Sequence, residues 1–247
     1  MSLLAAENIS VSFEGTKIIE DVTLSLSTGE TVSLLGVSGG GKTTLFNVLS
    51  GLYTPDEGKV YLDGEDITGK AGNISYMLQK DLLLPHKRVI DNAALPLILK
   101  GINKKEARKT AESHLCEFGL EGAGDKYPHQ LSGGMRQRVA FLRTYLASEK
   151  VALLDEPFSA LDSITKSAIH RWFLSVMAEI NLSVLFVTHD IDEAILLSDR
   201  IYLLTGKPGK ITDEIVINLP GEKSGRNPMS REFISYKEEI IKKIGII

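Results

Sequence analysis

One stretch constrains the fold of this chain more than any other. Residues 36–44 read Gly-Val-Ser-Gly-Gly-Gly-Lys-Thr-Thr, after a short apolar run at 32–35 and before a segment, 45–49, whose pattern predicts a helix. This glycine-rich P-loop pattern has a defined structural meaning only between a strand and a helix. We therefore expect the chain to be organised around a strand, a tight loop and a helix at this point.

The chemistry that this stretch favours is polyphosphate binding. Its glycines permit backbone conformations that side chains forbid, so successive N–H groups can converge on phosphate oxygens at a helix N-terminus. Lys42 adds a positive charge for the β- and γ-phosphates, and the Thr43 hydroxyl can ligate Mg²⁺. A glycine-rich turn without a ligand is the alternative, and the register of Lys42 and Thr43 argues against it. The expected nucleotide contacts here are Gly36, Ser38, Gly39, Gly40, Gly41, Lys42, Thr43 and Thr44.

Strand and helix patterns alternate along the rest of the chain. Residues 3–27 alternate apolar and polar positions around a turn at Glu14-Gly15, which predicts an antiparallel hairpin. Within 85–126 the periodicity becomes helical, and Arg108 and Glu112 are spaced for an ion pair. The basic cluster around Arg108 is interpreted as a solvated helix face. Short strands are also predicted at 58–64 and 74–78.

Two continuously apolar segments predict buried parallel strands that end in polar side chains. Residues 151–154 are followed by Asp155 and Glu156, which could hold Mg²⁺ and activate a water molecule. The strand at 183–187 leads to His189, which could contact a γ-phosphate. Gln79, at the end of the 74–78 strand, could bind Mg²⁺ or the attacking water. The other histidines, at 86, 114, 129 and 170, are assigned no chemistry.

A second anion site is predicted where a helix begins at Ser132 and runs to about Leu146. Ser132 is a favourable N-cap, and Gly133 and Gly134 expose backbone N–H groups where the helix dipole is positive. A capped helix without a ligand is the alternative. Phe13, in the first strand, could stack on a purine ring, although such a residue is more often part of a core.

Composition limits the class of protein. The chain has 247 residues, of which 43% are hydrophobic and 24% charged, as in ordinary globular proteins. Its net charge of -4 argues against a protein that coats nucleic acid by electrostatics alone. Cys116 is the only cysteine, so no intrachain disulfide forms, and we expect it buried on a helix. Because no signal-peptide pattern or sufficiently long apolar run occurs, we expect a cytoplasmic protein.

Taken together, the motifs resemble those of an ATP-binding cassette (ABC) ATPase. The resemblance covers residues 3 to about 217, and the Leu-Ser-Gly-Gly motif is close to diagnostic because other P-loop ATPases lack it. The motifs, in the order and approximate spacing of that family, are Phe13, 36–44, Gln79, 131–135, 154–157, 159–162 and His189.

The resemblance implies a fold. We expect one ABC ATPase domain over 1–247, with an α/β P-loop NTPase core, a mostly parallel sheet, an N-terminal antiparallel β subdomain and an inserted helical subdomain. The core would comprise 1–84 and 127–217, the helical subdomain mainly 85–126, and the C-terminal linker and helix 218–247.

The resemblance also implies an ATP- and Mg²⁺-dependent mechanism. A head-to-tail homodimer would enclose two ATP molecules, each between the P-loop of one subunit and Ser132, Gly133 and Gly134 of the other. Phe13 would stack on adenine, while Thr43, Gln79 and Asp155 would serve Mg²⁺. Glu156 would be the catalytic base and His189 would sense the γ-phosphate, with Lys42 and Gln79 completing the catalytic set. Asp162 would communicate across the dimer.

Family members of this size usually energise separate membrane permeases, peripherally on the inner face of the membrane. Segments 83–85, 91–97, 192–194 and 207–211 resemble importers of nitrate, sulfonates, taurine and related solutes, which also use a solute-binding protein. Met135 and His86 depart from the usual residues. The alternatives are a non-transport ABC ATPase on nucleic acid or ribosomes, disfavoured because coiled-coil heptads and repeats are missing, and a switch that does not hydrolyse ATP. We expect no nucleic-acid partner.

Overall fold

The computed structural model describes residues 2–37, 39–148 and 150–245. Within these residues the chain forms a four-stranded antiparallel sheet, in the order β2-β1-β4-β5, and a six-stranded sheet, in the order β10-β9-β3-β8-β7-β6. The strands are β1 Leu4–Phe13, β2 Thr16–Leu26, β3 Thr31–Gly36, β4 Glu57–Leu62, β5 Glu65–Asp66, β6 Ser75–Met77, β7 Val151–Asp155, β8 Ser183–Thr188, β9 Arg200–Thr205 and β10 Lys210–Val216.

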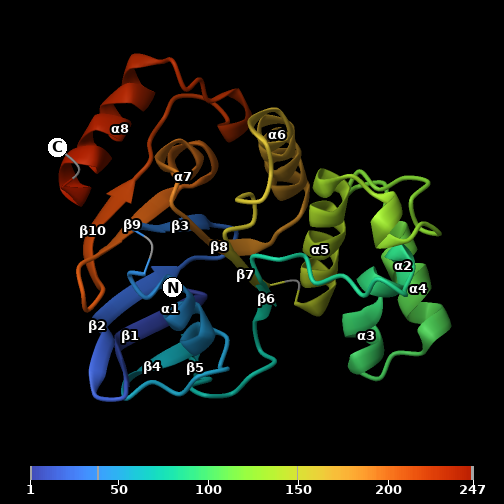
Figure 1. The fold of residues 1–247 in the computed structure, drawn as a ribbon, viewed down its shortest axis with the longest axis horizontal. Helices are drawn as coiled ribbons and strands as arrows, with labels where there is room; N and C mark the ends of the chain where they lie inside the picture. The colour runs from blue at the N-terminus through green and yellow to red at the C-terminus, as the bar shows by residue number, and fades with distance from the viewer. Residues whose placement is uncertain (1, 38, 149, 246–247) are drawn as a thin grey trace.

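Helices surround the larger sheet, and those within residues 89–147 form a helical lobe beside it (Figure 1). The helices are α1 Lys42–Leu49, α2 Val89–Ala93, α3 Leu95–Leu99, α4 Lys104–Ser113, α5 Gly133–Ala147, α6 Ser163–Glu179, α7 Ile191–Leu197 and α8 Arg231–Ile244, with 3-10 turns η1 Pro128–Gln130 and η2 Lys223–Gly225. The α/β class predicted from the sequence is therefore confirmed.

The six-stranded sheet is parallel except at one edge. Strands β6, β7, β8, β3 and β9 run parallel, and β10 pairs with β9 in the opposite direction. Every residue of β7 and β8 is buried, because side chains on both faces enter an apolar core. Along β7, Ala152 and Leu154 join the cluster on the helical side, while Val151 and Leu153 join the cluster that contains α1.

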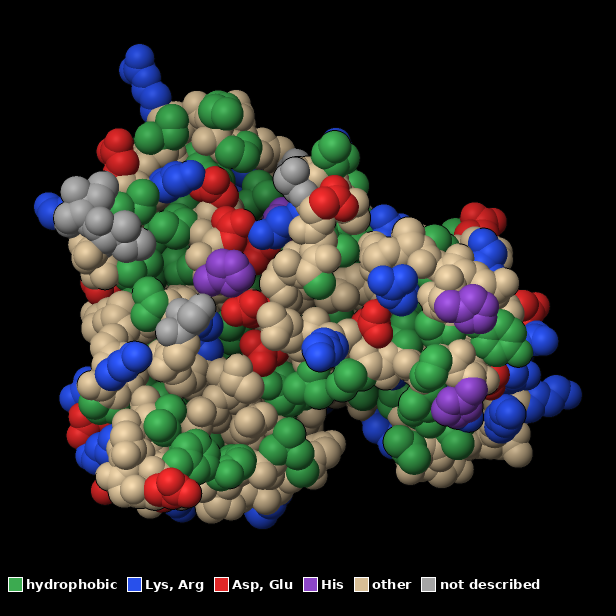
Figure 2. Space-filling model, viewed as in Figure 1, with side chains coloured by type: hydrophobic (Ala, Val, Ile, Leu, Met, Phe, Trp, Pro, Cys, Tyr) green, Lys and Arg blue, Asp and Glu red, His purple; other side chains and the backbone are tan. Residues whose placement is uncertain are grey.

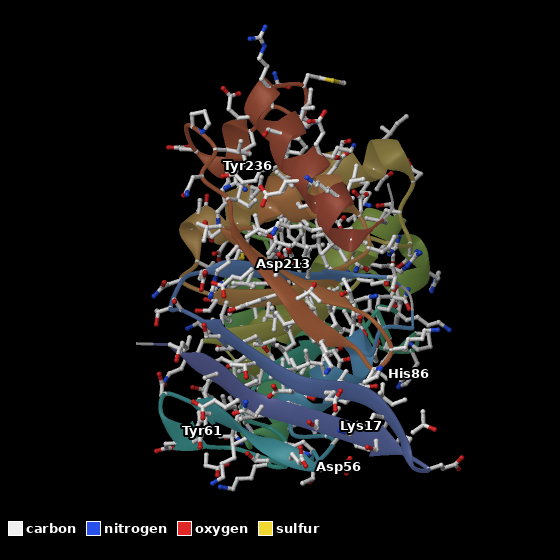
Figure 3. All side chains as sticks on the ribbon, turned by 90° about the vertical axis from the view of Figure 1, so that its left-hand side faces the viewer. Lys17, Asp56, Tyr61, His86, Asp213 and Tyr236 are labelled. Atoms are coloured by element: carbon white, nitrogen blue, oxygen red, sulfur yellow. The ribbon has the colours of Figure 1, made fainter. Side chains whose placement is uncertain are left out.

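The predicted N-terminal hairpin is present and turns at Glu14 and Gly15. Its first strand pairs with β4 on the other side, whereas β3, next in the chain, enters the larger sheet. In Figure 3 the labelled Lys17 and Tyr61 lie on this smaller sheet, below the layer of β10 and α8 that carries Asp213 and Tyr236. The hairpin thus belongs to the smaller sheet and lies next to the loop that follows β3.

Two expectations for the helical region were wrong. Arg108 forms a double hydrogen bond to the carboxylate of Asp91, at 2.8 and 2.7 Å, and not the expected pair with Glu112. Asp91 is held by α2, which packs on α4 and presents a fixed acceptor. Cys116 is exposed because the apolar face runs through Ala111, Leu115 and Phe118, and Cys116 lies beside that face instead of on it.

The C-terminal segment closes over α7 (Figure 1). Phe233 and Ile240 of α8 are fully buried and share a cluster with Ile195 of α7 and Leu35 of β3. Among the described residues, none of the helices is both long and apolar enough to cross a membrane.

Candidate functional site

The loop between β3 and α1 is packed so tightly at Gly36 and Gly41 that neither position has room for a side chain. Gly41 is the N-cap of α1 and has φ 90°, and a Cβ there would lie 2.4 Å from Ile19 Cγ2. A Cβ on Gly36 would lie 2.3 Å from the carbonyl oxygen of Leu204. Gly209 closes the loop from outside, where a Cβ would meet the Gly40 carbonyl at 2.1 Å. Of the predicted contacts, Ser38 lies outside the described residues.

Lys42 lies within the mouth of this loop. Its ammonium donates hydrogen bonds to the carbonyl oxygens of Gly36 and Val37, both at 2.9 Å, and the side chain is buried. Burial lowers the pKa of Lys42, while the nearby carboxylates of Glu156 and Asp155 act in the opposite direction. The geometry places a positive charge within the glycine-rich loop at the N-terminus of α1, where a phosphate group would be favoured.

Thr43 and Asp155 form a compact set of oxygen donors. The Thr43 hydroxyl donates to Asp155 Oδ2 at 3.2 Å, and the hydroxyl of Tyr76 donates to the same oxygen at 3.3 Å. Burial, followed by the charge of Glu156, raises the pKa of Asp155 against the effect of these hydrogen bonds. One hydroxyl and one carboxylate beside a phosphate-binding loop fit Mg²⁺, which binds through few protein ligands and substrate phosphates.

Glu156, Gln79 and His189 meet at the ends of three strands. Gln79 Nε2 donates to Glu156 Oε2 at 3.1 Å, and His189 Nδ1 lies 3.4 Å from Glu156 Oε1. Glu156 has a positive φ of 45°, unusual for a residue with a side chain, and its N–H donates to the Val187 carbonyl at 3.1 Å. This backbone turn aims the carboxylate at the other two side chains.

These three side chains line a cavity of about 780 Å³. In the face shown in Figure 2, acidic (red) and histidine (purple) side chains lie close together near the middle, between the β-rich part and the helical lobe. Gly133, at the start of α5, lines the same cavity. A carboxylate, an amide and an imidazole around one space can orient and deprotonate a water molecule.

The second predicted anion motif has the expected local structure. Ser132 caps α5, because its hydroxyl oxygen accepts the N–H of Met135 at 3.2 Å, and Gly133 and Gly134 form the first turn. Phe13 lies elsewhere, where its ring contacts Tyr53 edge-on at 5.1 Å. Over the described part of the chain, no hydrogen bond, ion pair or ring contact joins Phe13 or Ser132 to Lys42. Neither Phe13 nor Ser132 is thus in direct contact with Lys42 within the described residues of one chain.

Several residues of the site were not predicted. Tyr76 reaches Asp155 from β6 and carries no motif, although its position on the strand before Gln79 was a signal. The side-chain amide of Gln137 donates to the Pro157 carbonyl and fixes the turn after Glu156. His170, assigned no chemistry from the sequence, lies 2.9 Å from Glu193, four residues beyond His189.

The segment after Gln79 is anchored to the helical lobe. Arg143 of α5 donates to the carbonyl oxygens of Asp81 at 2.5 Å and Leu82 at 2.9 Å. The fully buried amide of Asn92 accepts the Leu84 N–H at 2.7 Å and donates to carbonyls of the same loop. The segment that follows Gln79 is therefore hydrogen-bonded to both α2 and α5.

Comparison with known proteins agrees with this geometry. A family model described as ABC transporter matches residues 19–159. The chain is 44% identical to the formylaminopyrimidine import ATP-binding protein of Halalkalibacterium halodurans, over 83% of this chain and 81% of that protein. It is 38% identical to the nitrate import ATP-binding protein of Synechocystis sp., over 90% of this chain and 86% of that protein.

A solved structure is similar over most of its length. It is a dimeric, post-hydrolysis state of an ATP-binding cassette bound to ADP and Pi, with a TM-score of 0.73 and 30% sequence identity. The match covers 87% of this chain and 99% of that one.

Proposed function

Because this chain belongs to the ABC transporter family and is an ATPase of that family, we propose that it powers the import of a small solute through separate membrane subunits. The observation that carries the proposal is the meeting of Glu156 with Gln79 and His189 beside the phosphate-binding loop. The relatives named as import ATP-binding proteins support the direction of transport.

In the proposed reaction, the P-loop N–H groups and Lys42 hold the β- and γ-phosphates of ATP, and Phe13 stacks on adenine. Thr43 and Asp155 would hold Mg²⁺, and Gln79 would supply a further ligand. When bound, Mg²⁺ would neutralise charge on the phosphates. Glu156 accepts a proton from the attacking water, and the exposed imidazole of His189 faces the γ-phosphate.

A second copy of the chain would complete the site. Ser132 caps α5, and Gly133 and Gly134 form its first turn. Within the described residues, no hydrogen bond or ion pair joins these three residues to the P-loop of their own chain. A head-to-tail homodimer would place them over the ATP bound to the partner, where a helix N-terminus favours negative charge. A site completed only by closure couples ATP binding to movement.

The proposed partners are an integral membrane permease and, indirectly, a solute-binding protein. The chain would act peripherally on the inner face of the membrane, with Mg²⁺ and ATP from the cytoplasm. Candidate solutes are nitrate, a sulfonate, taurine or a related small compound such as a formylaminopyrimidine. Uptake of each labelled solute into vesicles that contain the chain and its permease would identify the cargo.

Glu156→Gln tests the mechanism. Because the amide accepts no proton but preserves shape, we expect ATP turnover to fall by about 10²- to 10⁴-fold, while ATP still binds. Sedimentation at matched protein concentration is expected to show a dimer with Mg-ATP and a monomer with Mg-ADP.

Glu121→Gln, an exposed acid away from the cavity, is the control. Wild-type turnover by Glu156→Gln would sink the assignment of the base, and failure to copurify with any permease would sink the transport proposal.

A further inference from the structure

A buried polar network lies directly behind His189. The residues on either side of His189 are held by neighbouring helices. Thr188 is held by a side chain of α7, and Asp190 by a side chain of α6. Figure 1 shows these two helices on the same side of the sheet next to β8. The network therefore fixes the backbone on which the exposed imidazole of His189 stands.

Glu193 is the centre of the network. Only 4% of this side chain is exposed, yet both carboxylate oxygens have partners. The hydroxyl of Thr188 donates to Oε2, and His170 Nε2 lies 2.9 Å from Oε1. Lys166 Nζ lies 3.2 Å from the same Oε1 and 2.8 Å from Asp190 Oδ2. A buried carboxylate with this many partners is rigid, because each lost contact would leave a desolvated charge.

The same network reaches the loop of Glu156. The ring of His170 contacts Phe158 edge-on, with 4.9 Å between ring centroids, and Phe158 is two residues after Glu156. Phe158 is buried, and it packs in turn on Phe173 of α6. One helix face therefore holds both loops, that of His189 through Glu193 and that of Glu156 through Phe158.

We propose that Glu193, Thr188 and His170 are positioning residues for hydrolysis, which set the imidazole of His189 against Glu156 and the γ-phosphate. They touch no substrate and act through the backbone of residues 188–190. A displacement of about 1 Å at a reacting group can cost about 10²-fold in rate. The inference rests on the proposed role of His189 in ATP hydrolysis.

The test is a double-mutant cycle between Glu193→Gln and His189→Ala. Glu193→Gln keeps the shape of the side chain but removes the negative charge that Thr188, His170 and Lys166 contact. We expect kcat for ATP to fall about 10- to 100-fold, with KM changed by no more than about twofold. In the His189→Ala background, we expect the same substitution to change kcat by less than about twofold, because the residue it positions is gone.

The matched control is Glu117→Gln. It breaks another His–Glu contact, that with His114 at 2.8 Å, but in the helical lobe and away from the cavity. We expect wild-type kcat and KM. Should Glu193→Gln not fold, Thr188→Val and Thr188→Ser take its place, since only serine keeps the hydroxyl that donates to Glu193.

Each result has a distinct meaning. Loss of kcat in Glu193→Gln or Thr188→Val, recovery in Thr188→Ser and no further loss without His189 support the network. Effects that multiply with His189→Ala, or a fully active Glu193→Gln, overturn it. If His189→Ala has wild-type turnover, the proposed role of His189 is wrong. If His189→Ala loses turnover but Glu193→Gln keeps it, the role of His189 stands and the positioning role of Glu193 is wrong.

Discussion

Asp155 is an acid held in a buried position next to a second acid. Burial and the charge of Glu156 raise its pKa above the ordinary 3.8. The folded chain then binds this proton more tightly than the unfolded chain does. The contribution of Asp155 to stability is therefore greatest below pH 3.8 and is lost as the pH rises through the raised pKa. At neutral pH the folded state carries an ionised group that it disfavours.

We expect Asp155→Asn to be more stable than the wild type at pH 7.5 and much less active. Removing the unfavourable buried charge should raise Tm, and each kcal/mol gained corresponds to about 2–4 °C in a chain of this size. Asparagine retains an oxygen for the hydroxyl of Thr43 but cannot bind Mg²⁺ as a carboxylate does. Scanning calorimetry from pH 7.5 towards pH 4 should show the advantage shrinking, with ATP turnover assayed in parallel.

Glu20→Gln is a control of opposite sign. This partly exposed acid pairs with Lys17 and Lys210, first of all by hydrogen bonds, and its pKa is lowered to about 2. Its contribution is present above pH 4.5 and is lost as the pH falls, so the substitution should never raise Tm at pH 7.5. A lower Tm for Asp155→Asn at pH 7.5 would show that its hydrogen bonds outweigh the cost of burial.

At this scale, the sequence predicted which motif residues lie together better than it predicted other contacts. Thr43 contacts Asp155 beside Lys42 as expected, because residue types and spacing indicate that grouping directly; their roles in ATP hydrolysis stay predictions. Tyr76 and His170 could not, since their importance depends on which side chain of another element lies opposite. Arg108 illustrates the same limit: spacing along one helix suggested Glu112, but Asp91 on a neighbouring helix is the partner.

Among the elements, α7 is held at both ends by the C-terminal segment. Arg226 donates from Nη1 to the carbonyl oxygens of Ile195, Leu196 and Ser198, at 2.7, 3.1 and 2.7 Å. These carbonyls lie at the C-terminal end of the helix, where no further turn supplies N–H donors for them and a cation is favoured. At the other end, Lys237 of α8 pairs with Asp192 at 2.7 Å.

We expect Arg226→Ala to destabilise the protein by about 2 kcal/mol, because several hydrogen bonds from a charged group to buried carbonyls are lost. In a chain of this length the loss corresponds to a fall in Tm of about 4–8 °C. Arg231→Ala, an exposed arginine at the start of α8, should leave Tm within about 1 °C, as surface substitutions generally do. Equal shifts for the two variants would contradict the capping role.

Element types were predictable and their ends and partners were not. Continuous apolar residues predict strands such as β7 and β8, and a serine N-cap predicts the start of α5. Helix α4 ends at Ser113 although the apolar spacing continues through Leu115 and Phe118, which are buried from a turn, so spacing alone does not give the end of the helix. The contact of α8 with α7 depends on tertiary packing, so the local pattern of the tail gave no functional account of it.

Across the whole molecule, the edge of the sheet that carries Glu156 is connected to the helical lobe by the apolar core that they share and by the segment after Gln79. Gln79 contacts Glu156, and the residues that follow it are bound by Arg143 and Asn92 of the lobe. Tyr76, Leu99 and Arg143 also line a surface pocket on this side of the lobe. A partner that pushes on the lobe would thus move Gln79 relative to Glu156.

We expect Arg143→Met to separate hydrolysis from coupling. The methionine fills the space of the side chain's stem but leaves the carbonyls of Asp81 and Leu82 unheld, so a movement of α5 no longer pulls on Gln79. ATP turnover by the free chain should stay within about threefold of the wild type, whereas stimulation by the permease in proteoliposomes should fall at least about fivefold, the lower range of measured coupling energies.

Arg138→Met is the matched control for this last experiment. Arg138 is on the same helix, but its guanidinium lies over the ring of Trp172 at 4.9 Å and bonds the Gly119 carbonyl, away from the segment after Gln79. The same substitution there should preserve stimulation. If both variants lose it equally, the cause is a general softening of α5. If Arg143→Met stays fully coupled, the movement reaches Gln79 by another path, of which the buried amide of Asn92 is the next to test.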